Sequence, residues 1–206
     1  MTHTILQWMD LARSVGRSGA FNARTLRRRE RLRDTYAIVA RSLMQHRDFQ
    51  SAFDVGCANG FKLEVFLDAG IRVGGIDLSP DVLDVIPPAL RPFVQAADFA
   101  EAAGRWDLVT CVEMAEHIRP GRSGELVEVV TRLAERWIYF SAAPPGQLGH
   151  GHINLRPQAD WLQLFAERGW ARDDARTKAV KHDLAGLEAA PWLAANVIIL
   201  APAWLP

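Results

Sequence analysis

From residue 51 onward, short apolar runs alternate with segments whose apolar residues recur at helical spacing. A short apolar run bounded by turn residues predicts a strand, and apolar positions three or four residues apart predict a helix. The predicted strands are Ala52–Val55, Val73–Ile76, Phe93–Ala96, Asp107–Cys111, Trp137–Ser141 and Asn196–Leu200. The predicted helices are Phe61–Ala69, Pro80–Ile86, Gly124–Arg136 and about Gln158–Arg168. Strands that alternate with helices predict parallel βαβ units in one sheet, an α/β fold.

The first 48 residues have a different pattern. A helix is predicted over Phe21–His46 and a weaker one over Ile5–Arg13, with glycines at 16 and 19 between them. The whole chain has 206 residues, enough for one domain with a sizeable core and a terminal addition. We therefore predict an N-terminal helical extension or lid over residues 1–48 and one α/β domain over residues 49–206.

Charge is balanced overall but uneven along the chain. The 24 basic and 24 acidic residues cancel, yet residues 1–50 hold ten of the basic residues and four of the acidic ones. This asymmetry indicates either an anionic partner or the solvated face of an arginine-rich helix. Hydrophobic residues make up 49% and charged residues 23%, which is typical of a globular protein and excludes a disordered one.

The two cysteines and the N-terminus bear on location. Cys57 and Cys111 lie in apolar runs without metal-type spacing, which indicates buried thiols in a reducing compartment. Residues 1–20 contain no apolar stretch of signal-peptide length, and no run of the chain is long enough to span a bilayer. We expect a cytoplasmic protein with no membrane partner.

Acidic residues follow three consecutive predicted strands. The first strand ends in Asp54–Gly60 (sequence DVGCANG), where glycines permit a sharp turn and close approach of a ligand at a helix N-terminus. The second strand ends in Asp77, about 20 residues later, where a carboxylate can accept hydrogen bonds from both ribose hydroxyls. The third ends in Asp98 and Phe99, an acid for an adenine amino group and an aromatic ring to cover it. Together they predict a nucleoside-type cofactor site.

Two alternatives bear on this site. Each acid is also a candidate helix N-cap, since Asp77-Leu78-Ser79-Pro80 resembles a helix start. A nicotinamide dinucleotide is disfavoured, because the loop lacks the G-x-G-x-x-G spacing that a pyrophosphate needs.

Four segments resemble motifs I to IV of class I S-adenosylmethionine (SAM)-dependent methyltransferases, in order and with the usual spacing: Asp54-x-Gly56-x-x-Asn59-Gly60, Asp77-Leu78-Ser79, Ala97-Asp98-Phe99 and Asp107-Leu108-Val109. The resemblance covers about residues 50–200. It implies a Rossmann-like, seven-stranded, mostly parallel sheet with helices on both faces and an antiparallel last strand. It places SAM against Asp54, Gly56, Cys57, Asn59, Gly60, Asp77, Leu78, Asp98 and Phe99. One departure is Ala58, where the family usually has a second glycine.

The segment after the fourth strand carries acids and a histidine. If a helical turn begins there, Glu113, Glu116 and His117 share one face, which suits a Mg²⁺ or Mn²⁺ ion. The Pro- and Gly-rich loop 143–151, followed by His152, has the freedom to fold over a pocket.

This Glu-x-x-Glu-His element is similar to that of two metal-dependent O-methyltransferase groups, the small-RNA 3′-terminal 2′-O-methyltransferases and the ubiquinone-pathway enzymes. The resemblance implies a metal on Glu113, Glu116, His117 and one loop histidine. We prefer His152 to His150, because His-x-Asn followed by a helix that bears Trp161 is the better match. Residues 141–154 look more like bacterial small-molecule and saccharide methyltransferases, in which a metal is not general.

The chemistry predicts an O-methyltransferase. The sulfonium of SAM already activates the methyl group, but a hydroxyl acceptor needs its proton removed by a histidine, His117 or His152, or its pKa lowered by a cation. We predict methylation of a hydroxyl on a small molecule or saccharide. The alternatives are a metal-dependent RNA ribose 2′-O-methyltransferase, with the arginines between 24 and 33 on phosphates, and a non-catalytic SAM-fold partner subunit. The sequence does not set the oligomeric state.

Overall fold

The computed structural model describes residues 22–46 and 49–204. In these residues seven strands form one sheet in the order β3-β2-β1-β4-β5-β7-β6. Strands β1 to β5 are parallel, and β7 is antiparallel to both of its neighbours. The strands are β1 Ser51–Val55, β2 Arg72–Asp77, β3 Val94–Ala96, β4 Trp106–Val112, β5 Ala134–Ser141, β6 Trp170–Arg172 and β7 Ile198–Pro202. The predicted mostly parallel sheet with an antiparallel last strand is confirmed.

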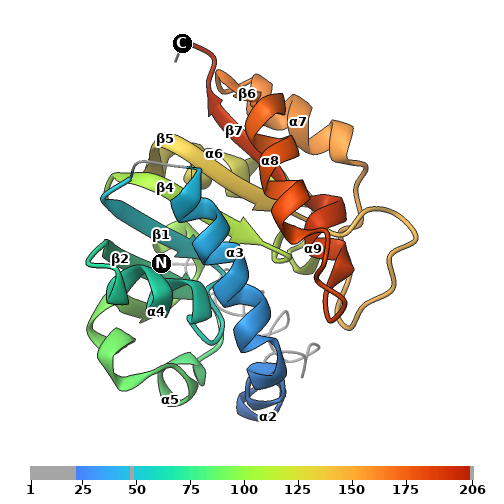
Figure 1. Ribbon diagram of the computed structural model, residues 1–206. Helices are drawn as coiled ribbons and strands as arrows, with labels where there is room; N and C mark the ends of the chain where they lie inside the picture. Colours follow the sequence, from blue (N-terminus) through green and yellow to red (C-terminus); the bar gives the residue numbers. More distant parts are fainter. Residues whose placement is uncertain (1–21, 47–48, 205–206) are drawn as a thin grey trace, which may run out of the picture.

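Helices cover both faces of the sheet (Figure 1). Side chains of α3, α4, α8 and α9 pack on one face, and those of α6 and α7 pack on the other. The α-helices are α2 Ala23–Arg28, α3 Arg33–Gln45, α4 Phe61–Asp68, α5 Val82–Val85, α6 Ser123–Leu133, α7 Gln158–Ala166, α8 Asp174–Leu184 and α9 Pro191–Asn196. The short 3₁₀ turns are η2 Arg29–Leu32, η3 Pro88–Phe93, η4 Phe99–Glu101, η5 Ala115–His117 and η6 Pro120–Arg122.

The central strands are buried on both sides, which explains their continuous apolar runs. Successive side chains of a strand point to opposite faces, so Leu108 joins the core under α3 and α4 while Val109 joins the core under α6 and α7. Two layers of helices therefore hold the sheet rigid, and the carboxyl ends of β1, β2 and β4 meet at one edge.

Several predicted boundaries were wrong. The helix predicted over residues 21–46 is interrupted by η2, and the one predicted over 124–136 ends at Leu133 because Ala134–Arg136 begin β5. The helix predicted over 80–86 shrinks to α5, since two prolines follow Ile86. The predicted Ile5–Arg13 helix lies outside the described residues.

Strand β6 and helices α8 and α9 were not predicted. In α8 only Thr177, Val180 and Leu184 are buried, so the segment lacks a continuous apolar stripe. Asn196, predicted to start a strand, instead ends α9.

The described part of the N-terminal segment lies against the edge of the sheet where the carboxyl ends of β1, β2 and β4 meet. The backbone N–H of Ala23 donates to Asp81 Oδ2 at 2.7 Å, and Asn59 Nδ2 donates to the carbonyl of Leu26 at 2.9 Å. Helix α3 is joined to α8 where Ser42 Oγ donates to Asp183 Oδ2 at 2.6 Å. The contacts of Ala23 and Leu26 fix α2 beside the loop that follows β1.

None of the helices formed by residues 22–46 and 49–204 combines the length and the apolar character needed to cross a bilayer.

Candidate cofactor and acceptor site

The loop after β1 makes a tight turn into α4. Gly56 has φ +76°, and a Cβ there would lie 2.4 Å from the side chain of Met114, so only glycine fits. The backbone N–H groups of Gly56 and Cys57 both donate to the carbonyl of Ile76, at 2.8 and 3.1 Å. Ala58, the departure from the family pattern, is also left-handed, with φ 46°. The loop therefore keeps the turn that two glycines would make, at the cost of strain in one alanine.

Replacing Ala58 by glycine is expected to raise the free energy of unfolding by up to about 1 kcal/mol, because the left-handed strain of alanine exceeds the entropy that glycine adds to the unfolded chain. Urea unfolding measures the change. A less stable glycine variant would show that the alanine methyl makes contacts worth more than the strain.

Asp77 ends β2 and braces the loop. Its Oδ2 accepts the N–H of Ala58 at 2.8 Å and its Oδ1 accepts the N–H of Ser79 at 2.9 Å. Burial raises the pKa of Asp77, and these two hydrogen bonds oppose the rise. The N-cap position of α5 is taken by Asp81, so Asp77 does not cap that helix. Leu78, next to it, is exposed. The carboxylate thus stands at the loop with lone pairs left for a ligand.

Asp98 and Phe99, predicted to hold an adenine ring, already contact an arginine. Arg122 donates through two nitrogens to the Asp98 carboxylate at 2.7 and 2.8 Å, and its guanidinium lies 4.2 Å from the centre of the Phe99 ring. Asp98 also accepts the N–H of Ala100 at 2.9 Å as the cap of η4. Burial would raise the pKa of Asp98, but the hydrogen bonds from Arg122 and Ala100 lower it. An adenine amino group at Asp98 has to share this carboxylate with Arg122 or displace it.

A recess opens beside the loop. It is lined by loop residues 56–59, Phe61, Lys62, Val112 and, from the N-terminal segment, Arg29 and Tyr36. Arg29, Tyr36 and Lys62 were not predicted from the sequence as site residues. Lys62 follows the loop by two residues, which was a usable signal, but the approach of Arg29 depends on how the N-terminal segment folds back.

Glu116 is buried in η5, the short turn that follows β4. In the part of the chain that the structure describes, neither of its carboxylate oxygens accepts a hydrogen bond of normal geometry. Burial first, and the negative charge of Glu113 second, raise the pKa of Glu116 to about 8, and the nearby N–H groups of Glu116 and Ala143 only moderate the rise. A buried carboxylate with no hydrogen bond of normal geometry favours either a proton or a cation beside it.

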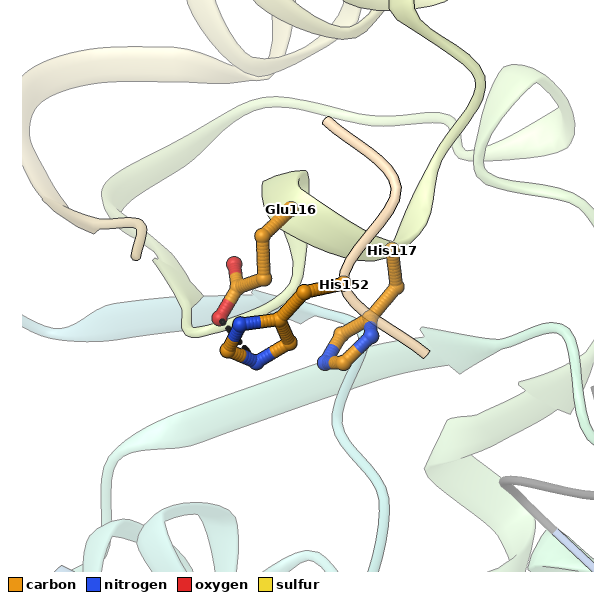
Figure 2. Close-up of side chains that lie close together, drawn as sticks. All are labelled: Glu116, His117 and His152. Atoms are coloured by element: carbon orange, nitrogen blue, oxygen red, sulfur yellow. Dashed lines mark ion pairs between the residues drawn. The ribbon is translucent and has the colours of Figure 1, made fainter. Parts of the chain in front are cut away.

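His117 and His152 stand beside Glu116 (Figure 2). One ligand atom from each of the three residues lies within 4.8 Å of the other two, and His152 Nε2 is 3.9 Å from Glu116 Oε1. Figure 2 shows the two imidazole rings next to each other, with the carboxylate against the His152 ring. Three of the four residues predicted to hold a metal therefore converge, from η5 and from the long loop.

Hydrogen bonds fix the tautomers of both histidines. His117 Nδ1 donates to the carbonyl of Gly151 at 3.0 Å, and His152 Nδ1 donates to the carbonyl of Gln147 at 3.1 Å, since a carbonyl oxygen only accepts. In a neutral ring, Nε2 then carries the lone pair that a metal ion requires. Burial lowers the pKa of His117 to about 4, so its ring is neutral at neutral pH.

The loop that carries His152 is tied to η5 by its backbone. The N–H groups of Ile153 and Asn154 both donate to the carbonyl of Glu116, at 2.9 and 3.0 Å. The side chain of Asn154 donates to the carbonyl of Ala115 and to Ser123 Oγ, each at 3.0 Å. The asparagine of the His-x-Asn sequence thus anchors the histidine next to Glu116.

Glu113 does not join the three-residue cluster. It precedes η5 in a left-handed conformation, φ 48°, which breaks the helical turn that was to place it on one face with Glu116. Its two oxygens accept hydrogen bonds from Asn196 Nδ2 at 3.1 Å and Gln147 Nε2 at 3.2 Å, and Asn196 also donates to Gln147. Its carboxylate is therefore committed to a network with the loop and α9.

Residues 24–141 match the family model of a methyltransferase domain, which is more than half of the chain. The ubiquinone biosynthesis O-methyltransferase of Methylococcus capsulatus is 36% identical over 165 residues, 68% of this chain and 65% of that protein. The enzyme of the same name from Thiobacillus denitrificans is 36% identical over 103 residues, 45% of this chain. That alignment spans 44% of the length of the Thiobacillus protein, so the chain matches less than half of it.

Solved structures share the fold. The magnesium protoporphyrin IX methyltransferase of Synechocystis, with bound S-adenosylhomocysteine (SAH), has a TM-score of 0.59 at 18% identity, covering 81% of this chain and 86% of that one. The sugar N-methyltransferase of a Streptoalloteichus species has a TM-score of 0.55 at 17% identity, covering 67% and 79%. With the sheet order, the loop after β1 and the match over residues 24–141, the chain belongs to the methyltransferase domain family, on the class I SAM-dependent methyltransferase fold.

Proposed function

We propose that this chain transfers the methyl group of SAM to a hydroxyl of a small-molecule acceptor, with a divalent cation held by Glu116, His117 and His152. The observation that carries the proposal is the buried Glu116 carboxylate, which accepts no hydrogen bond of normal geometry among the described residues and has a ligand atom within 4.8 Å of one on each of the two histidines. A carboxylate and two imidazole nitrogens form a donor set that suits Mn²⁺ or a related ion. A bound cation lowers the pKa of a hydroxyl that coordinates it.

The residues at the loop suit the cofactor. Asp77 stands at the end of β2 to accept from ribose hydroxyls, and the narrow turn at Gly56 brings backbone close to the bound molecule. SAM supplies an activated methyl group, so the protein has mainly to align the acceptor oxygen with it. We propose that α2 covers this cofactor loop, since Asn59 Nδ2 in the loop donates to the carbonyl of Leu26 in α2.

The acceptor class rests on the relatives and on the exposed loop. Two relatives are named for O-methylation in ubiquinone biosynthesis, and their likeness supports a hydroxyl as the target. A second oxygen beside that hydroxyl would let the acceptor chelate the proposed cation. Leu148 and Ile153, in the same loop as His152, are exposed and offer apolar contacts to such an acceptor. A metal-free mechanism with His117 as base is weaker, because a pKa of about 4 makes this imidazole a poor proton acceptor at neutral pH.

The test is transfer of labelled methyl from SAM to a panel of catechols, saccharides and short RNA, with EDTA and after adding back Mn²⁺ or Mg²⁺. We expect transfer to a catechol or vicinal diol, loss with EDTA and recovery with the metal. Transfer that EDTA does not reduce would contradict the metal, and transfer to RNA alone would contradict the small-molecule acceptor. No transfer to any member would count against the hydroxyl acceptors proposed.

Replacing Asp77 by asparagine is expected to weaken SAH binding about 10- to 100-fold, because the ribose hydroxyls lose a charged acceptor. Isothermal titration with SAH measures it. Asp84→Asn, an exposed acid nearby, is the matched control and should bind as the wild type does. Equal affinity in the Asp77 variant would show that this carboxylate only braces the loop.

A further inference from the structure

Arg122 lies where the sequence predicts the adenine ring. It ends η6 and stands at the N-cap position of α6. Its Nη1 donates to Asp98 Oδ2 at 2.7 Å and its Nη2 donates to Asp98 Oδ1 at 2.8 Å, so the guanidinium holds both oxygens of that carboxylate. The same guanidinium lies 4.2 Å from the centre of the Phe99 ring. One side chain therefore contacts both groups that were predicted to bind the base.

While Arg122 is in place, the Phe99 ring has little surface left for a second planar group. Phe99 is 5% exposed, and beneath the guanidinium it packs in the core under α6 and α7. Asp98 is less completely occupied. The N–H groups of Ala100 and Arg122 take the two lone pairs of Oδ1, and Oδ2 keeps one. An adenine amino group could share Asp98, but the base cannot lie on Phe99 until Arg122 leaves.

A guanidinium has the properties by which this part of the site would recognise adenine. Both groups are planar, both stack on an aromatic ring, and both present N–H donors in their plane. Arg122 thus contacts the acceptor and the ring face that the base would use. The arginine and the base therefore compete for Asp98 and Phe99.

Glu125 remains a partner for Arg122 when Arg122 leaves Asp98. Arg122 Nε donates to Glu125 Oε2 at 2.7 Å, and Nη2 donates to Glu125 Oε1 at 3.1 Å. The side chain of Arg122 is 31% exposed and that of Glu125 is 45% exposed, so both reach solvent. Displacement therefore does not leave a buried, unpaired positive charge, which would be costly.

We propose that Arg122 competes with the cofactor for its adenine site. It lies on Asp98 and Phe99 before the cofactor binds, moves towards Glu125 when the base enters, and so lowers the affinity for adenine nucleosides. The effect applies to SAM and to the product SAH alike, because both carry adenine, and weaker binding of SAH limits inhibition by the product. The inference rests on the proposed use of SAM and adds a residue that determines how tightly this chain binds it.

The test measures the binding of SAH and of adenosine by isothermal titration. Arg122→Ser is expected to bind each compound about 5- to 30-fold more tightly than the wild type, since binding no longer breaks an ion pair and a cation–π contact. Adenosine is uncharged, so the gain does not come from removing a positive charge near a charged ligand. Serine is favoured at a helix N-cap, the position of Arg122, so the variant is expected to fold.

Arg105→Ser is the matched control. Arg105 pairs with the exposed Glu135 and precedes β4, at the opposite end of that strand from the site, so its loss should leave both affinities unchanged. A second measurement follows Arg122 directly. In protein with isotopically labelled arginine, the NMR signal of Arg122 Nε, identified by its absence from the Arg122 variant, is expected to shift when SAH or adenosine binds.

The results separate this inference from the proposed cofactor. Equal or weaker binding by Arg122→Ser would show that the arginine supports Asp98 and does not compete with the base. That result, or an Arg122 signal that stays unchanged when SAH binds, would overturn the inference and leave the use of SAM intact. If neither the wild type nor the variant binds either compound, the proposed cofactor itself is refuted.

Discussion

Replacing Glu116 by glutamine is expected to lower methyl transfer by a factor of about 10³ or more while SAH binds as in the wild type, since a cation at a reacting oxygen contributes several kcal/mol. Glutamine keeps the shape of the side chain but removes the charge that would hold a cation. The residue lies in η5, whereas the proposed cofactor residues lie in the loop after β1 and at the end of β2. The substitution should therefore lower methyl transfer without changing the affinity for SAH.

The measurement pairs labelled methyl transfer with titrations of Mn²⁺ and of SAH. The variant is expected to lose Mn²⁺ binding and turnover together, and adding more metal should not restore it. Glu188→Gln, at an exposed position away from the site, is the control for a lost carboxylate. Normal turnover in the Glu116 variant would exclude the metal-assisted mechanism, whatever the affinity for SAH.

Local patterns predicted much of the fold and the edge of the site. The apolar runs that became β1, β2 and β4 are buried on both faces, and acids placed directly after parallel strands meet at one edge of a sheet. That rule alone brings Asp77 to the loop after β1. By contrast, only three of the eleven residues of α8 are buried, so its apolar residues do not recur at a spacing regular enough to predict a helix.

Long-range contacts explain what the sequence could not predict. Asp98 was assigned to adenine from its place after β3, but Arg122, 24 residues later, occupies its carboxylate. No local pattern pairs two residues across a turn, a strand and a loop. The predicted position of Glu113 was wrong for a different reason. A regular helical turn was predicted there, but Glu113 has a left-handed backbone conformation, which is rare for glutamate. Sequence patterns thus predict which residues lie at the edge of the sheet, but they do not predict which side chains those residues contact.

The pH dependence of stability gives an independent measure of the Glu116 site. The pKa of this carboxyl rises from 4.5 to about 8 in the folded protein, through burial and then the charge of Glu113. Between these values the folded state holds a proton that the unfolded state has released. The free energy of unfolding therefore falls as pH rises from about 4.5 to about 8, by about 1.4 kcal/mol per pH unit from this group.

Glu116→Gln removes that dependence. In EDTA, the melting temperature of the variant relative to the wild type is expected to rise with pH across this window, by about 3 to 6 °C per pH unit for a chain of this size. At pH 8, saturating Mn²⁺ should make the wild type melt at a higher temperature than the variant. The ion binds the ionised carboxylate of the wild type and stabilises only the folded state. A difference that stays flat with pH, as expected for Glu188→Gln, would mean that Glu116 is ionised in the folded protein without a metal. Its carboxylate would then have hydrogen-bond donors, and the argument for a cation at Glu116 would fail.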